Sequence, residues 1–200
     1  CTGKQFVKLW MHSEHLVVDN KKMSKSLGNF YTLRDLLNKG FSGIQVRYML
    51  LQTHYKTQLN FTFSGLDAAK GSLQRLQDFI LRLSEINKPT SFGLIQSTLD
   101  KALNAFTQSL SDDLNISAAL AVLFDLVREI NAMADAGKIG KEEAENTLLL
   151  LKRFNEVLGI LSFESPVEHI PDDLREALAK RIEARQQKNW ALSDSLRDFI

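Results

Sequence analysis

Apolar residues recur at every third or fourth position through most of the chain beyond residue 60, and this spacing predicts long amphipathic helices. The apolar stripes occupy residues 64–83, 99–110, 117–130 and 148–158. Segments rich in turn-forming residues separate them, such as NKPTSFG at 87–93. Helices joined by short connections bury such stripes against one another. We therefore predict a mostly α fold with an antiparallel helical bundle over residues 59–161.

The first sixty residues lack this helical spacing and alternate weakly between apolar and polar side chains. FVKLWMH (6–12) and HLVVD (15–19) fit two short strands, which we expect to form a β-hairpin. Thr32 and Ser42 each stand three positions ahead of a side chain that can complete a capping box, so each predicts a helix start. We expect two short helices here, the second over residues 43–55.

The last forty residues predict a linker and a helix hairpin. Residues 162–171 are poor in periodic apolar positions, and Pro171, followed by two aspartates, predicts a helix start. A helix over residues 173–187 then turns into a second helix over residues 190–200. Trp190 lies at the turn, and we expect it in the core of the hairpin rather than stacked on an RNA base.

The composition narrows the class of protein. The chain has 200 residues, of which 44% are hydrophobic, and this is enough for one or two compact cores. It has no run of about 18 apolar residues, which excludes a membrane-spanning helix. Its one cysteine, Cys1, gives no internal disulfide and fits a reducing compartment, so we expect a cytoplasmic protein. The chain begins without Met or a signal-peptide pattern and stops inside a predicted helix, so we expect a piece of a longer protein.

Positive charge is concentrated in the first sixty residues. Nine Lys and Arg against three Asp and Glu give this part a net charge of +6, and since the whole chain carries +1, the remainder carries −5. This concentration is compatible with a site for phosphates, but charge alone favours solvated lysines on a small domain.

The segment NKKMSKSLGNF (20–30) offers the chemistry of a phosphate site, between the predicted hairpin and a helix start. Its two serine hydroxyls can donate hydrogen bonds, and Gly28 permits a positive φ. Ammonium groups of lysine are compact charges, suited to a polyphosphate that is held and then released. On spacing alone, a solvated surface loop is the favoured interpretation, and a phosphate site is the alternative.

KMSKSLGNF at 22–30 is similar to the signature loop of the class I aminoacyl-tRNA synthetases. Longer segments resemble the cysteinyl-tRNA synthetases in order along almost the whole chain: LWMHSEHLVVDNKKMSKSLGNFYTLRDLL, VRYMLLQTHYKTQLNF, SDDLNISAALAVLFDLVREIN and RIEARQQKNWALSDSLRD. The resemblance implies that residues 1–58 end a Rossmann-like catalytic domain with its KMSKS loop and connecting helices. It further implies a tRNA-contacting bundle over 59–161, and over 162–200 a linker and hairpin that lead to an anticodon-binding tail beyond this chain.

The same resemblance implies an activity, namely ATP-dependent attachment of L-cysteine to tRNA(Cys) through a cysteinyl-adenylate. Lys25, assisted by Lys22, would stabilise the charge that develops on the departing pyrophosphate as the loop closes over ATP, and Mg²⁺ would accompany the nucleotide. The implied ATP-binding residues are Lys22, Met23, Ser24, Lys25 and Ser26. We expect a monomer.

Other parts of the family's machinery are absent from these 200 residues. The HIGH nucleotide motif does not occur. The family's single zinc ion (Zn²⁺) is held by two cysteines, a histidine and a glutamate upstream of this stretch, so we expect the chain alone to be inactive. His12 and His15 are three apart and would point to opposite faces of a strand, so we assign no metal ligand in this chain.

A second candidate site lies in the hairpin. Four of the nine residues from 180 to 188 are basic and could meet RNA phosphates, although a solvated helix face explains them equally well. These candidate tRNA-binding residues are Lys180, Arg181, Arg185 and Lys188.

Two alternative functions stay open. A mycothiol-type cysteine ligase also makes an aminoacyl-adenylate but transfers to a sugar amine, and the long bundle and hairpin tail argue against it. A non-catalytic helical module that binds RNA or protein would not need the intact KMSKS loop.

Overall fold

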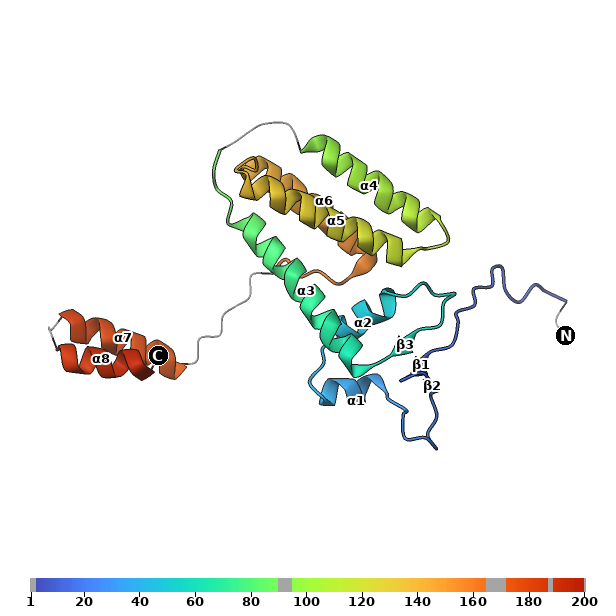
Figure 1. Cartoon of the computed structure of the whole chain (residues 1–200), viewed down its shortest axis with the longest axis horizontal. Helices are drawn as coiled ribbons and strands as arrows, with labels where there is room; N and C mark the ends of the chain where they lie inside the picture. The colour runs from blue at the N-terminus through green and yellow to red at the C-terminus, as the bar shows by residue number, and fades with distance from the viewer. Residues whose placement is uncertain (1–2, 90–94, 165–171, 187–188, 200) are drawn as a thin grey trace. The chain divides into compact units, whose positions relative to one another are not determined.

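The computed structural model describes residues 3–89, 95–164, 172–186 and 189–199. The chain divides into two compact units, residues 1–163 and residues 164–200, and each is described by itself (Figure 1). Helices make up most of both units, as the sequence predicts. Within the described ranges, no helix is both long enough and apolar enough to span a bilayer.

A small three-stranded sheet lies near the start of the first unit. β1 (Val17–Val18) pairs antiparallel with β2 (Lys21–Lys22) and parallel with β3 (Asn60–Phe61), in the order β2-β1-β3. The turn between β1 and β2 consists of Asp19 and Asn20, whose φ angles are 49° and 60°. Positive φ at both central positions is what a tight type I′ hairpin needs, and Asn and Asp tolerate it better than most residues.

The strand predicted over residues 6–12 is wrong. This segment has no strand partner among the described residues, and its large apolar side chains are exposed, from 58% for Met11 to 92% for Phe6. Alternation predicts an extended chain, but a strand also needs a free neighbouring edge. Both edges of β1 are already occupied by β2 and β3, so the hairpin forms one segment later than expected.

Two short helices follow the hairpin, and both begin where the sequence predicts. α1 (Leu33–Asn38) is capped by Thr32 and α2 (Gly43–Leu51) by Ser42, each with a complete capping box. α2 ends four residues earlier than expected, because the chain after it turns to bond with Asp113 in a distant connection.

Four long helices confirm the predicted bundle. They are α3 (Phe63–Ser84), α4 (Gln96–Ser111), α5 (Ile116–Asp135) and α6 (Lys141–Leu158). α4 packs against both α5 and α6, and α3 runs from this group to the region of α2 (Figure 1). Thr62 caps α3 and Asn115 caps α5, so each helix begins one residue before the start of its predicted apolar stripe.

The bundle core is filled by the predicted stripes. The most deeply buried side chains are Leu66, Leu76, Leu83, Leu123, Ile130, Leu151, Phe154 and Leu158. Phe106 of α4 stacks on Phe154 of α6, with ring centroids 4.0 Å apart and planes within 8°. Both rings are almost fully buried, so this pair holds the two helices together by close packing.

The second unit is the predicted helix hairpin, α7 (Asp172–Gln186) packed on α8 (Trp190–Phe199). The described side chains buried between the helices are small: Ala177, Ala184 and Ser193. Trp190 is 60% exposed, so the prediction that it lies in the core is wrong. Small residues let the helices approach closely and leave no room for an indole. The expected helix start at Pro171 and most of the expected linker (162–171) lie outside the described residues.

The stacked pair gives a test of the bundle. Phe154→Ala should destabilise the chain by about 3–5 kcal/mol, because it removes a buried ring and leaves a cavity against Phe106. Leu149→Ala on the same helix should cost about 0.5 kcal/mol or less, because Leu149 is 61% exposed. Urea unfolding followed by far-ultraviolet circular dichroism measures both. Equal losses, or a non-cooperative transition in the parent chain, would contradict the packed bundle.

Candidate functional site

The candidate site is the lysine loop, residues 22–30, which leads from β2 to α1. Its first residue, Lys22, is the last residue of β2 and is therefore paired with β1. The β1–β2 hairpin is also bonded to β3, because Asn20 N–H in its turn donates to Asn60 Oδ1 at 2.8 Å. The backbone at the start of the loop is therefore fixed by the sheet.

The side chain of Asn29 closes the loop. Its Oδ1 accepts from the backbone N–H of Ser24 at 2.9 Å, and its Nδ2 donates to the backbone carbonyl of Lys22 at 3.2 Å. Leu27 N–H also donates to Ser24 Oγ at 3.2 Å. The end of the loop is thereby bonded back to its beginning.

Residues 25–28 form the tip of the loop. Gly28 N–H donates to the carbonyl of Lys25 at 3.2 Å, and Gly28 has φ +66°, a conformation that glycine adopts without the cost a side chain would add. The hydroxyls of Ser24 and Ser26 lie 3.2 Å apart. Two hydroxyl groups therefore converge beside the turn that carries Lys25.

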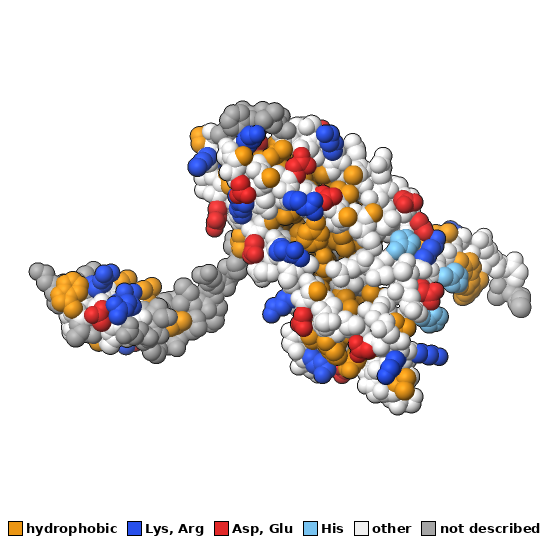
Figure 2. All heavy atoms as spheres, in the orientation of Figure 1, with side chains coloured by type: hydrophobic (Ala, Val, Ile, Leu, Met, Phe, Trp, Pro, Cys, Tyr) orange, Lys and Arg blue, Asp and Glu red, His pale blue; other side chains and the backbone are white. Residues whose placement is uncertain are grey.

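The two motif lysines are exposed and carry no carboxylate partner within the described ranges. Lys25 Nζ lies 5.7 Å from the centre of the Phe30 ring, a cation–π contact. Met23 is half-buried and packs against the core, so an apolar contact joins the start of the loop to the core. Figure 2 shows Lys and Arg side chains standing out from the surface at the end of the first unit that holds the sheet and α1.

This arrangement can bind an anion. Exposed ammonium groups, converging hydroxyls and a backbone fixed at its base are the elements of a phosphate site. Lys22, Met23, Ser24, Lys25 and Ser26 are consecutive residues of this loop, and their binding of ATP stays a prediction. Asn29 and Phe30 belong to the same motif, but the sequence pattern predicts no role for either of them.

The basic residues of the helix hairpin, on α7, form a separate candidate site for binding tRNA. Lys180 Nζ lies 2.8 Å from Glu176 Oε1, and this hydrogen bond lowers the pKa of Glu176. Arg181 is half-buried and Arg185 is exposed. Lys188 lies outside the described residues.

Two sets of polar contacts, here called ties, join the segment that follows the lysine loop (residues 43–56) to the bundle. The sequence did not predict either of them. The first is Arg47 of α2, whose Nε donates to the carbonyl of Leu158 at 2.5 Å and whose Nη2 donates to that of Val157 at 3.3 Å. These carbonyls at the end of α6 have no partner within their own helix. Gly159 permits the contact, because a Cβ there would lie 3.2 Å from Arg47 Nε.

The second tie is centred on Asp113, in the connection between α4 and α5. Tyr55 Oη donates to Asp113 Oδ1 at 2.6 Å, and Lys56 Nζ lies 2.5 Å from Oδ2. The ring of His54 bonds to the Asp113 carbonyl at 2.9 Å. The hydrogen bonds from Lys56 and Tyr55 hold the pKa of Asp113 below its ordinary value of 3.8, and the same bonds raise the pKa of Lys56 and of Tyr55.

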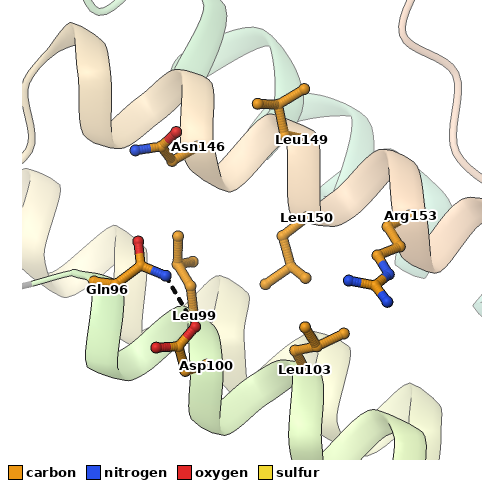
Figure 3. A pocket seen from close by; sticks show the side chains of 8 residues that line it. All are labelled: Gln96, Leu99, Asp100, Leu103, Asn146, Leu149, Leu150 and Arg153. Atoms are coloured by element: carbon orange, nitrogen blue, oxygen red, sulfur yellow. Dashed lines mark hydrogen bonds between the residues drawn. The ribbon is translucent and has the colours of Figure 1, made fainter.

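One groove lies elsewhere, between α4 and α6, with a volume of about 250 Å³ (Figure 3). Leu99, Leu103 and Leu150 form its floor, and a Gln96–Asp100 hydrogen bond of 2.9 Å lies on its wall. It includes no residue of the lysine loop and no cluster of titratable groups. Across the described ranges, no three His, Cys, Asp or Glu side chains gather where they could hold a metal ion.

Two family models match the chain. The model of the tRNA synthetases class I (C) catalytic domain matches residues 1–71, and that of the DALR domain matches residues 105–162. The sheet, α1 and α2 therefore belong to the end of a class I catalytic domain, and a helical DALR domain follows.

Curated relatives align with almost all of the chain. A cysteine–tRNA ligase of Protochlamydia amoebophila is 62% identical over 200 residues, which is 100% of this chain and 42% of that protein. Cysteine–tRNA ligases of Chlamydia felis and Chlamydia muridarum are 50% identical over 201 and 207 residues, each 98% of this chain and 42% and 43% of those proteins. The chain therefore spans about 42% of the length of the relatives it matches.

The Asp113 tie predicts a pH dependence. Because the folded pKa is lowered, the carboxylate stabilises the fold above its ordinary pKa of 3.8, and this stabilisation is lost as pH falls through the lowered value. Asp113→Asn should therefore lower the melting temperature at pH 7, and its difference from the parent should shrink as pH falls below 3.8. Asp67→Asn, at an exposed position of α3, is the control and should have no effect at either pH. A melting-temperature difference for Asp113→Asn that stays constant with pH would overturn this assignment.

Proposed function

We propose that this chain, which belongs to the cysteine–tRNA ligase family, carries the phosphate-binding loop and the tRNA-contacting helices of an enzyme that attaches cysteine to tRNA(Cys) using ATP. The observation that carries the proposal is the lysine loop, where two exposed ammonium groups without carboxylate partners among the described residues share one short segment with two hydroxyls 3.2 Å apart. Because the chain spans about 42% of its relatives' length, the proposed activity belongs to the longer protein.

The proposed reaction has two steps. In the first, a carboxylate oxygen of cysteine attacks the α-phosphorus of ATP, the bond to the bridging oxygen breaks, and pyrophosphate leaves with its electron pair. In the second, a hydroxyl of the tRNA 3′-terminal ribose attacks the adenylate carbonyl, and AMP leaves. Negative charge grows on the pyrophosphate during the first step, so that is where fixed cations lower the barrier.

Each loop residue has a proposed role in that first step. Lys25 at the tip places its ammonium against the departing pyrophosphate, and Lys22 adds a second cation at the base. The hydroxyls of Ser24 and Ser26 donate to phosphate oxygens, and half-buried Met23 holds the loop to the core. Mg²⁺ would accompany ATP, and zinc would be held by residues outside this chain.

The remaining assignments are proposals of the same kind. Residues 1–58 would end the catalytic domain, 59–161 would form the tRNA-contacting bundle, and 162–200 would lead to an anticodon-binding tail. Basic residues of the hairpin would meet tRNA phosphates, which Lys180, Arg181 and Arg185 support by lying on one helix. A cytoplasmic monomer fits these assignments.

Lys25→Ala in the full-length enzyme should slow adenylate formation by roughly a hundredfold, or about 3 kcal/mol, and should change ATP affinity much less. Lys22→Ala should act in the same direction, and Lys25→Arg should not restore the full rate, because a planar fork replaces a point charge. Rapid-quench measurement of adenylate at saturating ATP gives these rates.

Lys70→Ala is the matched control for that experiment, since Lys70 is exposed on α3 and away from the motif. The isolated chain, which lacks the HIGH motif, should show no cysteine-dependent exchange of pyrophosphate into ATP. A wild-type rate for Lys25→Ala would contradict the proposal and would show that the loop is an ordinary solvated surface turn.

The proposal that the helix hairpin contacts tRNA phosphates predicts how tRNA affinity depends on salt concentration. If the Lys180 and Arg185 side chains contact phosphates, replacing both by Ala should weaken tRNA binding. It should also reduce the slope of log affinity against log salt concentration by about one unit per lost contact. Titrations of the full-length enzyme with tRNA at several salt concentrations measure the slope. An unchanged slope would show that these residues form a solvated helix face.

A further inference from the structure

We propose that Asn29 is a positioning residue for adenylate formation, because its side-chain amide fixes the backbone from which Lys25 reaches the phosphates. This inference rests on the proposed function of Lys25. It adds a residue that touches neither substrate nor metal and acts only through the shape of the lysine loop.

The first step of the argument is that both ends of the Asn29 amide are engaged by the backbone. Oδ1 accepts from Ser24 N–H at 2.9 Å, and Nδ2 donates to the Lys22 carbonyl at 3.2 Å. The orientation of the amide is determined by chemistry, since a flipped amide would place a donor against the N–H and an acceptor against the carbonyl. Asparagine is one of the few side chains that can satisfy both partners at once.

The second step is where these two bonds fall in the loop. Lys22 is held by the sheet, whereas Ser24 directly precedes the tip that carries Lys25. Asn29 therefore joins the fixed base to the start of the tip. Three other hydrogen bonds shape the tip: Gly28 N–H to the Lys25 carbonyl, Leu27 N–H to the Ser24 hydroxyl, and the bond between the Ser24 and Ser26 hydroxyls. All three lie within the tip or join it to Ser24, and none of them reaches the sheet.

The third step is that the Leu27 bond depends on a side chain that the proposed function also uses. Ser24 Oγ accepts from Leu27 N–H, so a rotation of this side chain toward a phosphate oxygen changes that bond. The bonds of Asn29 use only backbone atoms of its partners and stay intact when both serine hydroxyls and both ammonium groups engage the nucleotide. Asn29 can thus hold the loop in shape throughout the reaction, and a loss of about 1 Å in placement is enough to slow a reaction strongly.

The test is a double-mutant cycle in the full-length enzyme. Asn29→Ala should slow adenylate formation about tenfold with a smaller change in the KM for ATP. It should slow the Lys25→Ala enzyme much less than tenfold, because the group that Asn29 positions is then gone. Asn104→Ala, at an exposed position of α4, is the matched control and should leave the rate unchanged. Melting temperatures should agree among all variants.

Amide hydrogen exchange in the isolated chain gives a readout that does not depend on activity. The Ser24 amide should exchange faster in Asn29→Ala, whereas in Asn29→Asp a carboxylate still accepts from it and should retain part of the protection. Asn29→Asp cannot donate to the Lys22 carbonyl, so its adenylate rate should stay below wild type.

The outcomes separate the two proposals. A slow Lys25→Ala enzyme with a wild-type rate for Asn29→Ala would overturn the role of Asn29 and leave the proposed function standing. An equal loss from Asn29→Ala in the presence and absence of Lys25 would also overturn it, because Asn29 would then act independently. A wild-type rate for Lys25→Ala would overturn the proposed function and this inference with it, even if the Ser24 amide lost its protection.

Discussion

The placement of the lysine loop depends on the two residues of β1, which pair on both sides. On one side, β1 holds β2 and with it the backbone of Lys22. On the other, Val17 N–H donates to the Leu59 carbonyl at 2.9 Å and Asp19 N–H to that of Phe61 at 3.1 Å. The residue after β3 is Thr62, the cap of α3. One buried strand thus joins the candidate phosphate site to the longest helix of the first unit.

The bundle is tied to the same region at points far apart in the sequence. Arg47 satisfies two carbonyls at the end of α6, and Asp113 accepts from Tyr55 and Lys56 in the segment that follows α2. Exposed ion pairs contribute little singly, but a carboxylate with several donors is held in one geometry. These contacts therefore hold α2, the end of α6 and the α4–α5 connection in a defined relation within the first unit.

The features that the sequence predicted correctly depend on interactions between residues close together in the chain. The caps at Thr32 and Ser42 and the four apolar stripes depend on residues three or four apart, and the structure confirms them. Strand pairing depends on which edges are free elsewhere, so the strand over residues 6–12 was wrong and β3 was missed. The exposure of Trp190 was also missed, because spacing along α8 does not report the size of the residues on α7.

The candidate site divides in the same way. The residue types of the lysine loop were compatible with an anion site and with a solvated surface loop. The resemblance to class I synthetases favoured the anion site and supplied its proposed substrate. The spacing could not predict that Asn29 turns back to Lys22 and Ser24, because a loop has no periodic geometry from which to derive side-chain direction.

The physical logic of the loop lies in the contrast between its base and its tip. At the base, Val18 is 1% exposed and the sheet fixes the backbone, so that end is as rigid as the core. At the tip, exposed hydrogen bonds contribute about 0.5–1.5 kcal/mol each and Lys25 rests on the Phe30 ring by a weak cation–π contact. Contacts of that size can be exchanged for phosphate oxygens without unfolding anything beneath them. A side chain that binds a polyphosphate and then releases it needs a fixed backbone at the base of its loop and only weak contacts in the absence of ligand. The lysine loop has both features.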